Sequence, residues 1–353
     1  RWFPLLLPIL LAAPCVADTP PGCAHEEIAF TCGEFGLVGD LLLPPGPGPH
    51  PVVVYVWGAG PTNRSAHVER SRVLRTFLDH GHGVYLYDKP GSGDSTGRLS
   101  SRRLFRQRAD ILQAALQMLQ DHPEVDGRAI GLYGSSQAAY VLAVVLADRS
   151  AAADPAFLIA WSCPMQDSLR QSAYLVRNYL LCEGHSRDEA LQAERAYLRR
   201  GRAITYDEYE AAALYLEGIP AIRDGLGWAG VVAAQHFTPA DTLASESFLD
   251  PARSITRLDM PTLALFAEND RQIDPVQGAA VFRRLVATAG DTLSRVVTIA
   301  GADHNMILSP RGCMQDQRDR YRAVGGPTLA PDFLATLAGW LDRLREAGRS
   351  TAP

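Results

Sequence analysis

A strand, a tight turn and a helix follow one another between residues 129 and 147, and this succession constrains the fold more than any other feature. The apolar residues 129–133 predict a short strand, and the Ala-rich residues 138–147 predict a helix. Ser136 falls in the turn between them, and its small neighbours Gly134 and Ala138 let the two backbones pass close together. A serine at such a turn is exposed beside a helix N-terminus, which suits a nucleophile. The alternative is a structural serine that caps the helix.

Strand-like and helical segments alternate along most of the chain. Short apolar runs predict strands at residues 51–57, 83–87, 129–133, 157–161, 262–267 and 295–299. Amphipathic patterns predict helices at residues 68–80, 104–119 and 331–345. Residues 26–43 predict an antiparallel hairpin, with its turn near residues 33–36, at one edge of the sheet. The alternation is typical of an α/β fold with a mainly parallel sheet and helices on both faces.

One region interrupts this alternation. Between residues 165 and 258 no strong strand pattern appears, and helical stretches are predicted at residues 166–182, 186–200 and 206–216. A helical insertion in such a sheet is expected to cover the carboxyl ends of the strands, where ligands bind. Its aromatic side chains either line an apolar pocket or form its own core: Tyr174, Tyr179, Tyr197, Tyr209, Tyr215 and Trp228. We therefore predict a core of residues 24–164 and 259–347 and a cap of residues 165–258.

A serine nucleophile needs a base to take its proton and an acid to orient that base. The strand predicted at residues 262–267 is followed by three candidate acids, Glu268, Asp270 and Asp274. Asp274 precedes a proline at a predicted helix start and is expected to cap that helix, so Asp270 is the better orienting acid. His304 follows the last predicted strand among small residues. The order Ser136, Asp270, His304, each in a loop after a strand, predicts a catalytic triad.

The anionic intermediate of acyl transfer needs backbone N–H donors. Gln137 follows the candidate nucleophile and can supply one donor from a helix N-terminus. The second is expected in the loop after the strand at residues 51–57, where small residues let a backbone approach the substrate. Ala59 is the predicted donor there, with Gly60 as the next choice, and a plain Gly-rich turn as the alternative.

Composition and charge restrict the partners. The 353 residues carry a net charge of -5, which argues against nucleic acid or an anionic membrane as the main partner. Residues 2–11 are apolar and small residues follow, so we predict a signal peptide over residues 1–17 and a secreted or periplasmic protein. Residues 11–15 also resemble a lipoprotein cleavage box, which leaves a lipid anchor open. We expect no stable membrane insertion after cleavage.

Export permits disulfides. Five cysteines would remain after cleavage, and the pairs nearest in sequence are Cys23 with Cys32 and Cys163 with Cys182, although spacing leaves the connectivity open. The sequence shows neither a metal-ligand spacing nor a phosphate-binding loop. We therefore expect no metal and no cofactor.

Taken together, these motifs resemble the α/β-hydrolase superfamily, in particular its bacterial dienelactone-hydrolase and serine-aminopeptidase-like branch. The resemblance rests on residues 58–61, residues 87–97, the Ser136 turn and the loops of Asp270 and His304. It implies a sheet of about eight strands, a helical cap after the sixth, no cofactor and a covalent acyl-enzyme. The chain departs from the family pattern at Trp57, where His is usual, at Pro90, where Arg is common, and at residues 138–139, where two Ala replace Gly.

The predicted function is a secreted serine hydrolase that acts on a small-molecule carboxylic ester or thioester. An exopeptidase of the serine aminopeptidase type is the alternative within the same chemistry. It would need an acidic group in the cap to hold a free amino terminus, and the candidates are Glu183, Glu208, Glu210 and Glu217. A non-catalytic binding protein on a hydrolase fold is the alternative from another class.

Overall fold

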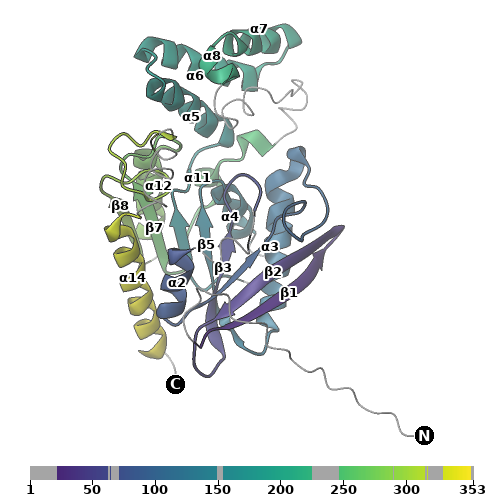
Figure 1. Ribbon diagram of the computed structural model, residues 1–353, viewed down its shortest axis with the longest axis vertical. Helices are drawn as coiled ribbons and strands as arrows, with labels where there is room; N and C mark the ends of the chain where they lie inside the picture. Colours follow the sequence, from purple (N-terminus) through teal and green to yellow (C-terminus); the bar gives the residue numbers. More distant parts are fainter. Residues whose placement is uncertain are drawn as a thin grey trace, which may run out of the picture.

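A mainly parallel sheet of eight strands forms the centre of the molecule in the computed structural model (Figure 1). The structure describes residues 22–62, 64, 71–148, 154–224, 246–288, 290–314, 316 and 329–350. The strands are β1 (Ala24–Cys32), β2 (Phe35–Leu43), β3 (His50–Val56), β4 (Gly83–Tyr87), β5 (Val125–Ser135), β6 (Leu158–Trp161), β7 (Thr262–Ala267) and β8 (Arg295–Ile299). Their order is β1-β2-β4-β3-β5-β6-β7-β8. The predicted α/β class with a mainly parallel sheet is confirmed.

The antiparallel hairpin lies at one edge, as its sequence predicts. Strand β1 pairs with β2 over their full lengths, and Cys32 faces Phe35 across the turn that contains Gly33. Gly33 has a φ of +57°, a conformation that glycine adopts without steric cost. Strand β2 then pairs antiparallel with β4, and all further pairs are parallel. The carboxyl ends of β3 to β8 therefore meet at one edge of the sheet.

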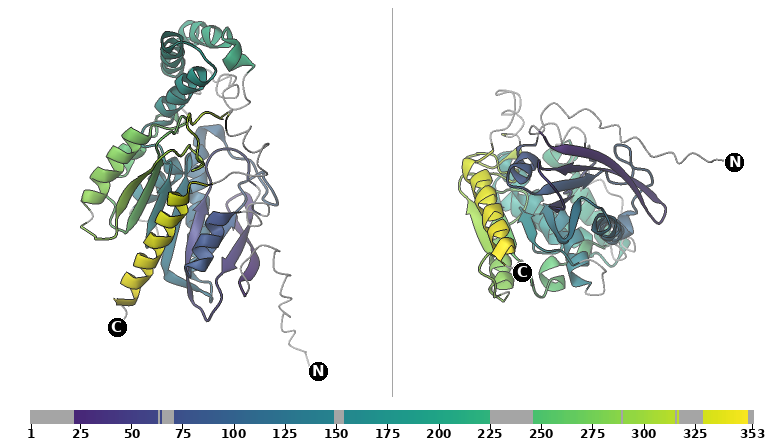
Figure 2. Two further views of the ribbon diagram at one scale, coloured as in Figure 1. Left: turned by 60° about the vertical axis from the view of Figure 1, so that its left-hand side comes forward. Right: turned by 90° about the horizontal axis from the view of Figure 1, so that it is seen from below.

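Helices cover both faces of the sheet and bury two separate apolar clusters. On one face α3 (Leu104–Gln120), α4 (Ala138–Ala147) and α12 (Pro275–Ala287) pack over β2, β3, β5 and β7. On the other face α2 (Arg72–Asp79) and α14 (Pro331–Ser350) lie side by side (Figure 2). The inner strands β3, β4 and β7 are apolar and buried along nearly their whole length, because helices cover both faces of the sheet there. The fully buried Phe282 and Trp340 represent the two clusters.

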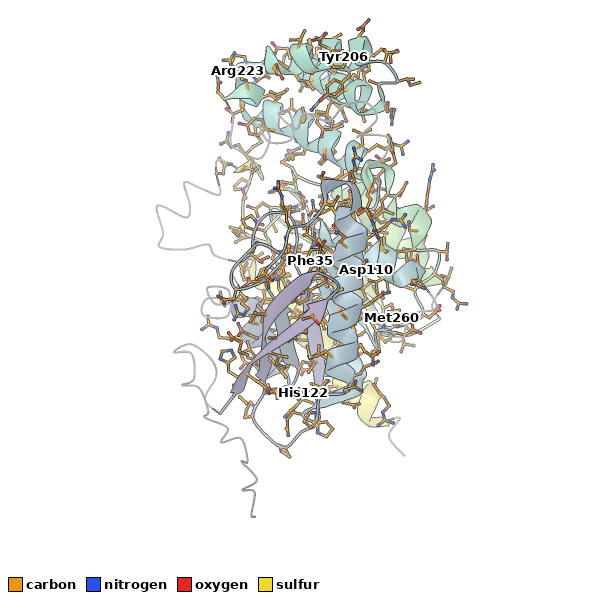
Figure 3. All side chains as sticks on the ribbon, turned by 90° about the vertical axis from the view of Figure 1, so that its right-hand side faces the viewer. Phe35, Asp110, His122, Tyr206, Arg223 and Met260 are labelled. Atoms are coloured by element: carbon orange, nitrogen blue, oxygen red, sulfur yellow. A yellow bond between two sulfur atoms is a disulfide. The ribbon has the colours of Figure 1, made fainter. Side chains whose placement is uncertain are left out.

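In the described part of the chain after β6, four helices project beyond the sheet: α5 (Ser168–Cys182), α6 (Arg187–Arg202), α7 (Tyr206–Glu217) and α8 (Pro220–Arg223) (Figure 1). Figure 3 places Tyr206 and Arg223 at the opposite end of the molecule from His122, which precedes β5. These helices therefore lie at the end of the sheet where β5 and its parallel neighbours end. The short elements η2 (Glu246–Phe248) and α11 (Pro251–Ser254) lead back to β7. The domain boundaries themselves stay predictions.

The projecting helices have a small apolar core of their own. Its buried residues are Val176, Leu180, Ala190, Ala193, Ala196, Leu216 and Ile222. Two of these helices begin with a capping box. In this motif a short polar side chain at the N-cap accepts a hydrogen bond from a backbone N–H group that has no partner within the helix. In α6 the pair is Ser186 with Glu189, and in α7 it is Thr205 with Glu208. The helix predicted at residues 186–200 is α6, and Ser186 is its N-cap residue.

Helix and strand ends differ from the sequence predictions by a few residues. Strand β5 begins at Val125, four residues before the predicted strand, because its first residues pair with the start of β3. The helix predicted from residue 68 begins at Arg72, where the Ser71 side chain accepts a hydrogen bond from the Leu74 N–H. Residues 65–70 lie outside the described residues, as do the predicted signal peptide and Trp228. Among the described helices, none has both the length and the apolar character that crossing a membrane requires.

Among the described cysteines, one disulfide forms, between Cys182 and Cys313, which are 131 residues apart in sequence. Neither pair of cysteines nearest in sequence forms, and Cys163 is a buried thiol on the sheet side of α5. Nearness in sequence is a poor guide here because the chain returns to the end of α5 only after crossing β7 and β8. The disulfide links the projecting helices to the loop that follows β8.

Candidate active site

Ser136 lies at the sharp turn between β5 and α4. Its φ is +53°, which a residue with a side chain adopts at a steric cost and which is frequent at functional turns. The Ser136 N–H donates a hydrogen bond of 2.9 Å to the Trp161 carbonyl, so the neighbouring strand holds the turn in place. A side-chain methyl at Gly134 would lie 3.2 Å from the Ala138 Cβ. Strand and helix thus approach closely at this position, which favours a glycine there.

His304 lies between Ser136 and Asp270. Its Nε2 is 3.0 Å from the Ser136 Oγ, and its Nδ1 is 2.7 Å from the Asp270 Oδ2. With a proton on Nδ1, the imidazole donates to the carboxylate, and Nε2 accepts from the serine hydroxyl. His304 and Asp270 are both buried, whereas Ser136 is partly exposed. The structure therefore brings together the three side chains that the sequence singles out.

The other two candidate acids have different positions. Asp274 caps α12, since its side chain accepts hydrogen bonds from the N–H groups of Val276 and Gln277. Glu268 accepts a hydrogen bond of 2.7 Å from the Gly301 N–H. Only Asp270 of the three contacts His304 among the described residues. Its second oxygen, Oδ1, accepts from two backbone N–H groups of its own loop, at residues 272 and 273, which fixes the direction of the carboxylate.

The surroundings of His304 favour its protonated form. Burial disfavours the imidazolium, but the charge and hydrogen bond of Asp270, with a further contribution from Asp303, outweigh it and raise the pKa of His304 above its ordinary value. A base with a raised pKa is a stronger proton acceptor. Because it must be neutral to accept a proton, the site is expected to work above this pKa.

The loop after β3 passes directly beside the nucleophile. A side-chain methyl at Gly58 would lie 3.3 Å from the Ser136 Cβ and 3.2 Å from the Ser135 carbonyl oxygen. The next residue is Ala59, and Gln137 is the N-cap residue of α4. Among the described residues, the backbone N–H groups of Ala59 and Gln137 donate no hydrogen bond. Both are thus free to bind an oxygen in the site, although their role as donors to an oxyanion stays a prediction.

Two buried basic side chains beside this loop escape the sequence analysis. Lys89 is 7% exposed and donates hydrogen bonds from Nζ to the carbonyls of Gly58 and Gly60. Arg108 is 5% exposed and donates to the Trp57 carbonyl and the Gln137 Oε1. A signal for Arg108 exists in the sequence, because it falls on the apolar face of the helix at residues 104–119. Lys89 carries a weaker signal as the only lysine of the chain.

Burial also shifts the pKa values of these two groups. Burial and, to a smaller extent, the charge of Arg108 lower the pKa of Lys89 to about 6. Burial lowers the pKa of Arg108 to about 10, partly opposed by Tyr87. Arg108 therefore stays cationic at neutral pH, whereas Lys89 titrates near it. Either form of Lys89 keeps two N–H groups for its two carbonyl acceptors.

The first helix of the insertion contacts the loop of Asp270. The Tyr174 hydroxyl donates a hydrogen bond of 3.2 Å to the Asp270 carbonyl, and the Gln171 Nε2 donates one of 2.8 Å to the Gln272 carbonyl. Tyr174 thus lies close to the site, whereas Tyr179 is buried in α5 and Tyr215 is partly exposed on α7. The four glutamates considered for an exopeptidase, at residues 183, 208, 210 and 217, are all solvent-exposed.

Two cavities of substantial size lie at the projecting helices. One of about 650 Å³ is formed by α6 and α7 and includes Leu198, Arg199 and Ala212. The other, of about 320 Å³, lies where α5 and α6 meet η2 and α11, and includes Arg202, Phe248 and Arg253 in its lining. None of the tyrosines considered for an apolar pocket lines either cavity. Within the described residues, no cluster of three or more His, Cys, Asp or Glu side chains could hold a metal ion.

A sequence model of the alpha/beta hydrolase family matches residues 41–316. The chain belongs to the alpha/beta hydrolase family. The match extends from β2 to the loop beyond β8 and contains Ser136, Asp270 and His304. The eight-stranded, mainly parallel sheet of the chain is that of the α/β-hydrolase fold, which the sequence predicts. The dienelactone-hydrolase and serine-aminopeptidase-like branch stays a prediction.

Solved structures with the same fold include enzymes described as esterases. DcsB, solved in complex with its substrate analogue, is 16% identical, with a TM-score of 0.54 over 91% of this chain and 98% of that one. A hyperthermophilic esterase from the archaeon Pyrobaculum calidifontis is 16% identical, with a TM-score of 0.54 over 94% and 86%. An esterase of Pyrococcus furiosus is 13% identical, with a TM-score of 0.53 over 90% of each chain. At these identities the likeness shows the fold. Among curated proteins, none matches the sequence.

Proposed function

We propose that this alpha/beta hydrolase is a serine enzyme that cleaves carboxylic esters or thioesters of small molecules through a covalent acyl-enzyme. The observation that carries the proposal is the hydrogen-bonded series Asp270, His304, Ser136, with distances of 2.7 and 3.0 Å. Such a series has the donor and acceptor directions that nucleophilic catalysis by serine requires. The esterases among the similar structures favour esters over other acyl substrates.

In the first half of the reaction, His304 Nε2 takes the proton of Ser136 while its Oγ forms a bond to the acyl carbon. The carbonyl oxygen becomes an oxyanion, which the N–H groups of Ala59 and Gln137 bind. Collapse of this intermediate breaks the bond to the leaving alcohol or thiol, and His304 returns the proton to it. Asp270 stays ionised and stabilises the imidazolium.

In the second half a water molecule replaces the leaving group. His304 takes one proton from the water, whose oxygen attacks the acyl carbon bound to Ser136. The resulting intermediate collapses to a carboxylic acid, and the proton returns to the serine oxygen. The balance is one ester and one water consumed, one acid and one alcohol formed. No other reactant is required.

A series of p-nitrophenyl esters of increasing chain length tests this proposal, beside a series of aminoacyl p-nitroanilides. We expect ester turnover that the Ser136→Ala variant loses by at least about 10³-fold. Ser136-dependent turnover of anilides in preference to esters would move the function to an exopeptidase. A folded protein that neither turns over any of these substrates nor reacts with a fluorophosphonate would support the binding-protein alternative instead.

We also propose that the mature protein is exported, because disulfides persist in oxidising compartments. The Cys182–Cys313 disulfide and the apolar residues 2–11 support this proposal. Fractionation of the producing bacterium, with mass spectrometry of the N-terminus, tests it. We expect a periplasmic or extracellular protein that begins at Asp18. Full-length protein with reduced cysteines in the cytoplasm would contradict it.

A further inference from the structure

The two basic side chains beside the nucleophile are buried without a counter-ion. Within the described part of the chain, neither Lys89 nor Arg108 forms an ion pair, and their polar contacts are backbone carbonyls and one amide oxygen. Such burial costs free energy, whether the group stays charged, as Arg108 does at neutral pH, or largely loses its proton, as Lys89 does. Buried basic groups of this kind are therefore retained where they have a use. Lys89 contacts the loop of Ala59, and Arg108 contacts both this loop, at Trp57, and the second proposed donor residue, Gln137.

Lys89 fixes the direction of the peptide planes in the loop after β3. Its Nζ donates to the carbonyl oxygens of Gly58 at 2.8 Å and Gly60 at 2.5 Å, the two residues that flank Ala59. In a trans peptide the C=O and the following N–H point in opposite directions. Because the Gly58 carbonyl faces Lys89, the Ala59 N–H faces away from it and stays free of the lysine.

The same chain segment holds the far end of this loop. The Lys89 N–H donates a hydrogen bond of 2.8 Å to the Thr62 Oγ1. The Asp88 carboxylate accepts two hydrogen bonds of 3.0 Å from Arg64, one from its backbone N–H and one from Nη1. Asp88 and Lys89 together therefore hold the loop at four of its residues, from Gly58 to Arg64.

Arg108 connects the loop to the nucleophile turn. One nitrogen of its guanidinium, Nη1, donates to the Gln137 Oε1 at 3.0 Å, and the other, Nη2, donates to the Trp57 carbonyl. Trp57 is two residues before Ala59, and Gln137 carries the second proposed donor. The fork of a guanidinium holds both partners in one plane, which a flexible ammonium cannot do.

We propose that Lys89 and Arg108 are positioning residues that hold the N–H groups of Ala59 and Gln137 at the spacing which an oxyanion requires. Lys89 orients the Ala59 peptide, and Arg108 sets the distance between the two donor segments. This inference rests on the proposed function, since it assigns a role within the same reaction. Removing one oxyanion donor costs about 10²–10³-fold in kcat, and a displacement of about 1 Å can cost about 10²-fold.

The test compares three variants with one control on the best p-nitrophenyl ester. Lys89→Met keeps the length of the side chain and removes both hydrogen bonds. Arg108→Lys keeps the charge and removes the fork, and Gln137→Met removes only the acceptor while the backbone N–H stays. Arg106→Met is the matched control, because this arginine is on the same helix with its side chain 65% exposed. Titration with a fluorophosphonate gives the concentration of active sites. Because kcat is calculated per active site, misfolded protein does not lower it.

We expect Lys89→Met and Arg108→Lys to lower kcat by about 10–10²-fold with KM changed by less than about 3-fold. A trifluoromethyl ketone forms an anionic adduct with the serine, and its affinity should fall by the same factor as kcat. The affinity of the uncharged alcohol product should not change. A merely structural role would affect both ligands alike.

The inference would be overturned, and the proposed function left intact, if the variants react with the fluorophosphonate and their kcat values are within about 2-fold of that of Arg106→Met. Should Arg108→Lys fail to fold, Lys89→Met and Gln137→Met decide the question by the same two readouts. A wild-type protein without Ser136-dependent turnover would overturn the proposed function and this inference with it. The two failures are therefore distinguishable.

Discussion

At the scale of single residues, Asp270 differs from the other two candidate acids in the hydrogen bonds that its carboxylate oxygens accept. Asp274 caps α12 and Glu268 accepts from Gly301, and neither is within hydrogen-bond distance of His304 among the described residues. Asp270 accepts backbone N–H groups with one oxygen and faces His304 with the other. The backbone contacts hold the carboxylate in the orientation that fixes the tautomer of the imidazole.

The charge of Asp270 leads to a prediction about pH. His304 accepts the proton of Ser136 only when neutral, so kcat/KM is expected to fall as the pH falls through the pKa of His304, which Asp270 raises. In Asp270→Asn the attraction is lost while the burial of His304 remains, so its pKa should drop. We expect the acidic limb of the kcat/KM profile to move to lower pH and kcat to fall by about 10⁴-fold.

A pH series of ester hydrolysis with wild type and Asp270→Asn measures both effects. Asp274→Asn is the control, since this residue caps α12 and makes no contact with His304 among the described residues. It should retain the position of the limb. An acidic limb that stays in place or moves to higher pH in Asp270→Asn would contradict the role assigned to the carboxylate.

At the scale of elements, the junction of β5 and α4 depends on a glycine that faces the helix. A methyl group at Gly134 would lie 2.6 Å from the Leu142 Cδ1 and 3.2 Å from the Ala138 Cβ. Ala138 is fully buried. The extra methyl of Ala138, relative to the glycine that the family pattern has there, is accommodated because Gly134 has no side chain. The departure from the pattern is therefore compatible with a tight turn.

Gly134→Ala should therefore destabilise the protein. Forcing an additional methyl into a close-packed junction costs about 1–3 kcal/mol, because Leu142 and Ala138 must both move. Gly339→Ala is the matched control, since a methyl there meets only the Arg343 Nη1 at 3.8 Å on α14. In a helix this change is expected to be neutral or to stabilise by up to about 1 kcal/mol.

Urea unfolding of the two variants beside wild type gives the free energies. The midpoint should fall for Gly134→Ala and stay or rise for Gly339→Ala, at equal slopes. The ester activity of Gly134→Ala should fall as well, because the same turn carries Ser136. Equal midpoints for the two variants would show that the junction is not closely packed.

At the scale of the whole molecule, the sequence predicts those features that depend on local hydrophobic periodicity and on the order of segments along the chain. The strands, the mainly parallel character of the sheet and the three loops of Ser136, Asp270 and His304 follow from local patterns, because parallel strands bring their carboxyl ends together. Cys182 and Cys313 were not paired from the sequence, since contacts across 131 residues depend on the finished fold. Lys89 and Arg108 were missed for a related reason, because their acceptors are mostly backbone carbonyls, which residue identities do not reveal.

The Cys182–Cys313 disulfide, which the sequence does not predict, joins the projecting helices to the loop after β8. It connects the end of α5 to Cys313, in the loop that contains His304 nine residues earlier. Gln171 and Tyr174 of α5 also donate hydrogen bonds to the loop of Asp270. A bond that closes such a long segment of chain restricts the unfolded state strongly and typically contributes about 2–4 kcal/mol.

Loss of this bond should therefore lower the Tm of the whole protein by several degrees, about 3–10 °C. Cys182→Ser with Cys313→Ser removes it, and Cys32→Ser is the control, since Cys32 is a partly exposed thiol on β1. Dithiothreitol should lower the Tm of wild type and of the control toward that of the double variant, and should leave the double variant unchanged. Because the bond holds the helix that contacts the Asp270 loop, ester turnover should also become more sensitive to heat in the double variant. A wild-type Tm that stays constant after mass spectrometry has shown full reduction would mean that the packing of α5 alone holds the projecting helices on the sheet.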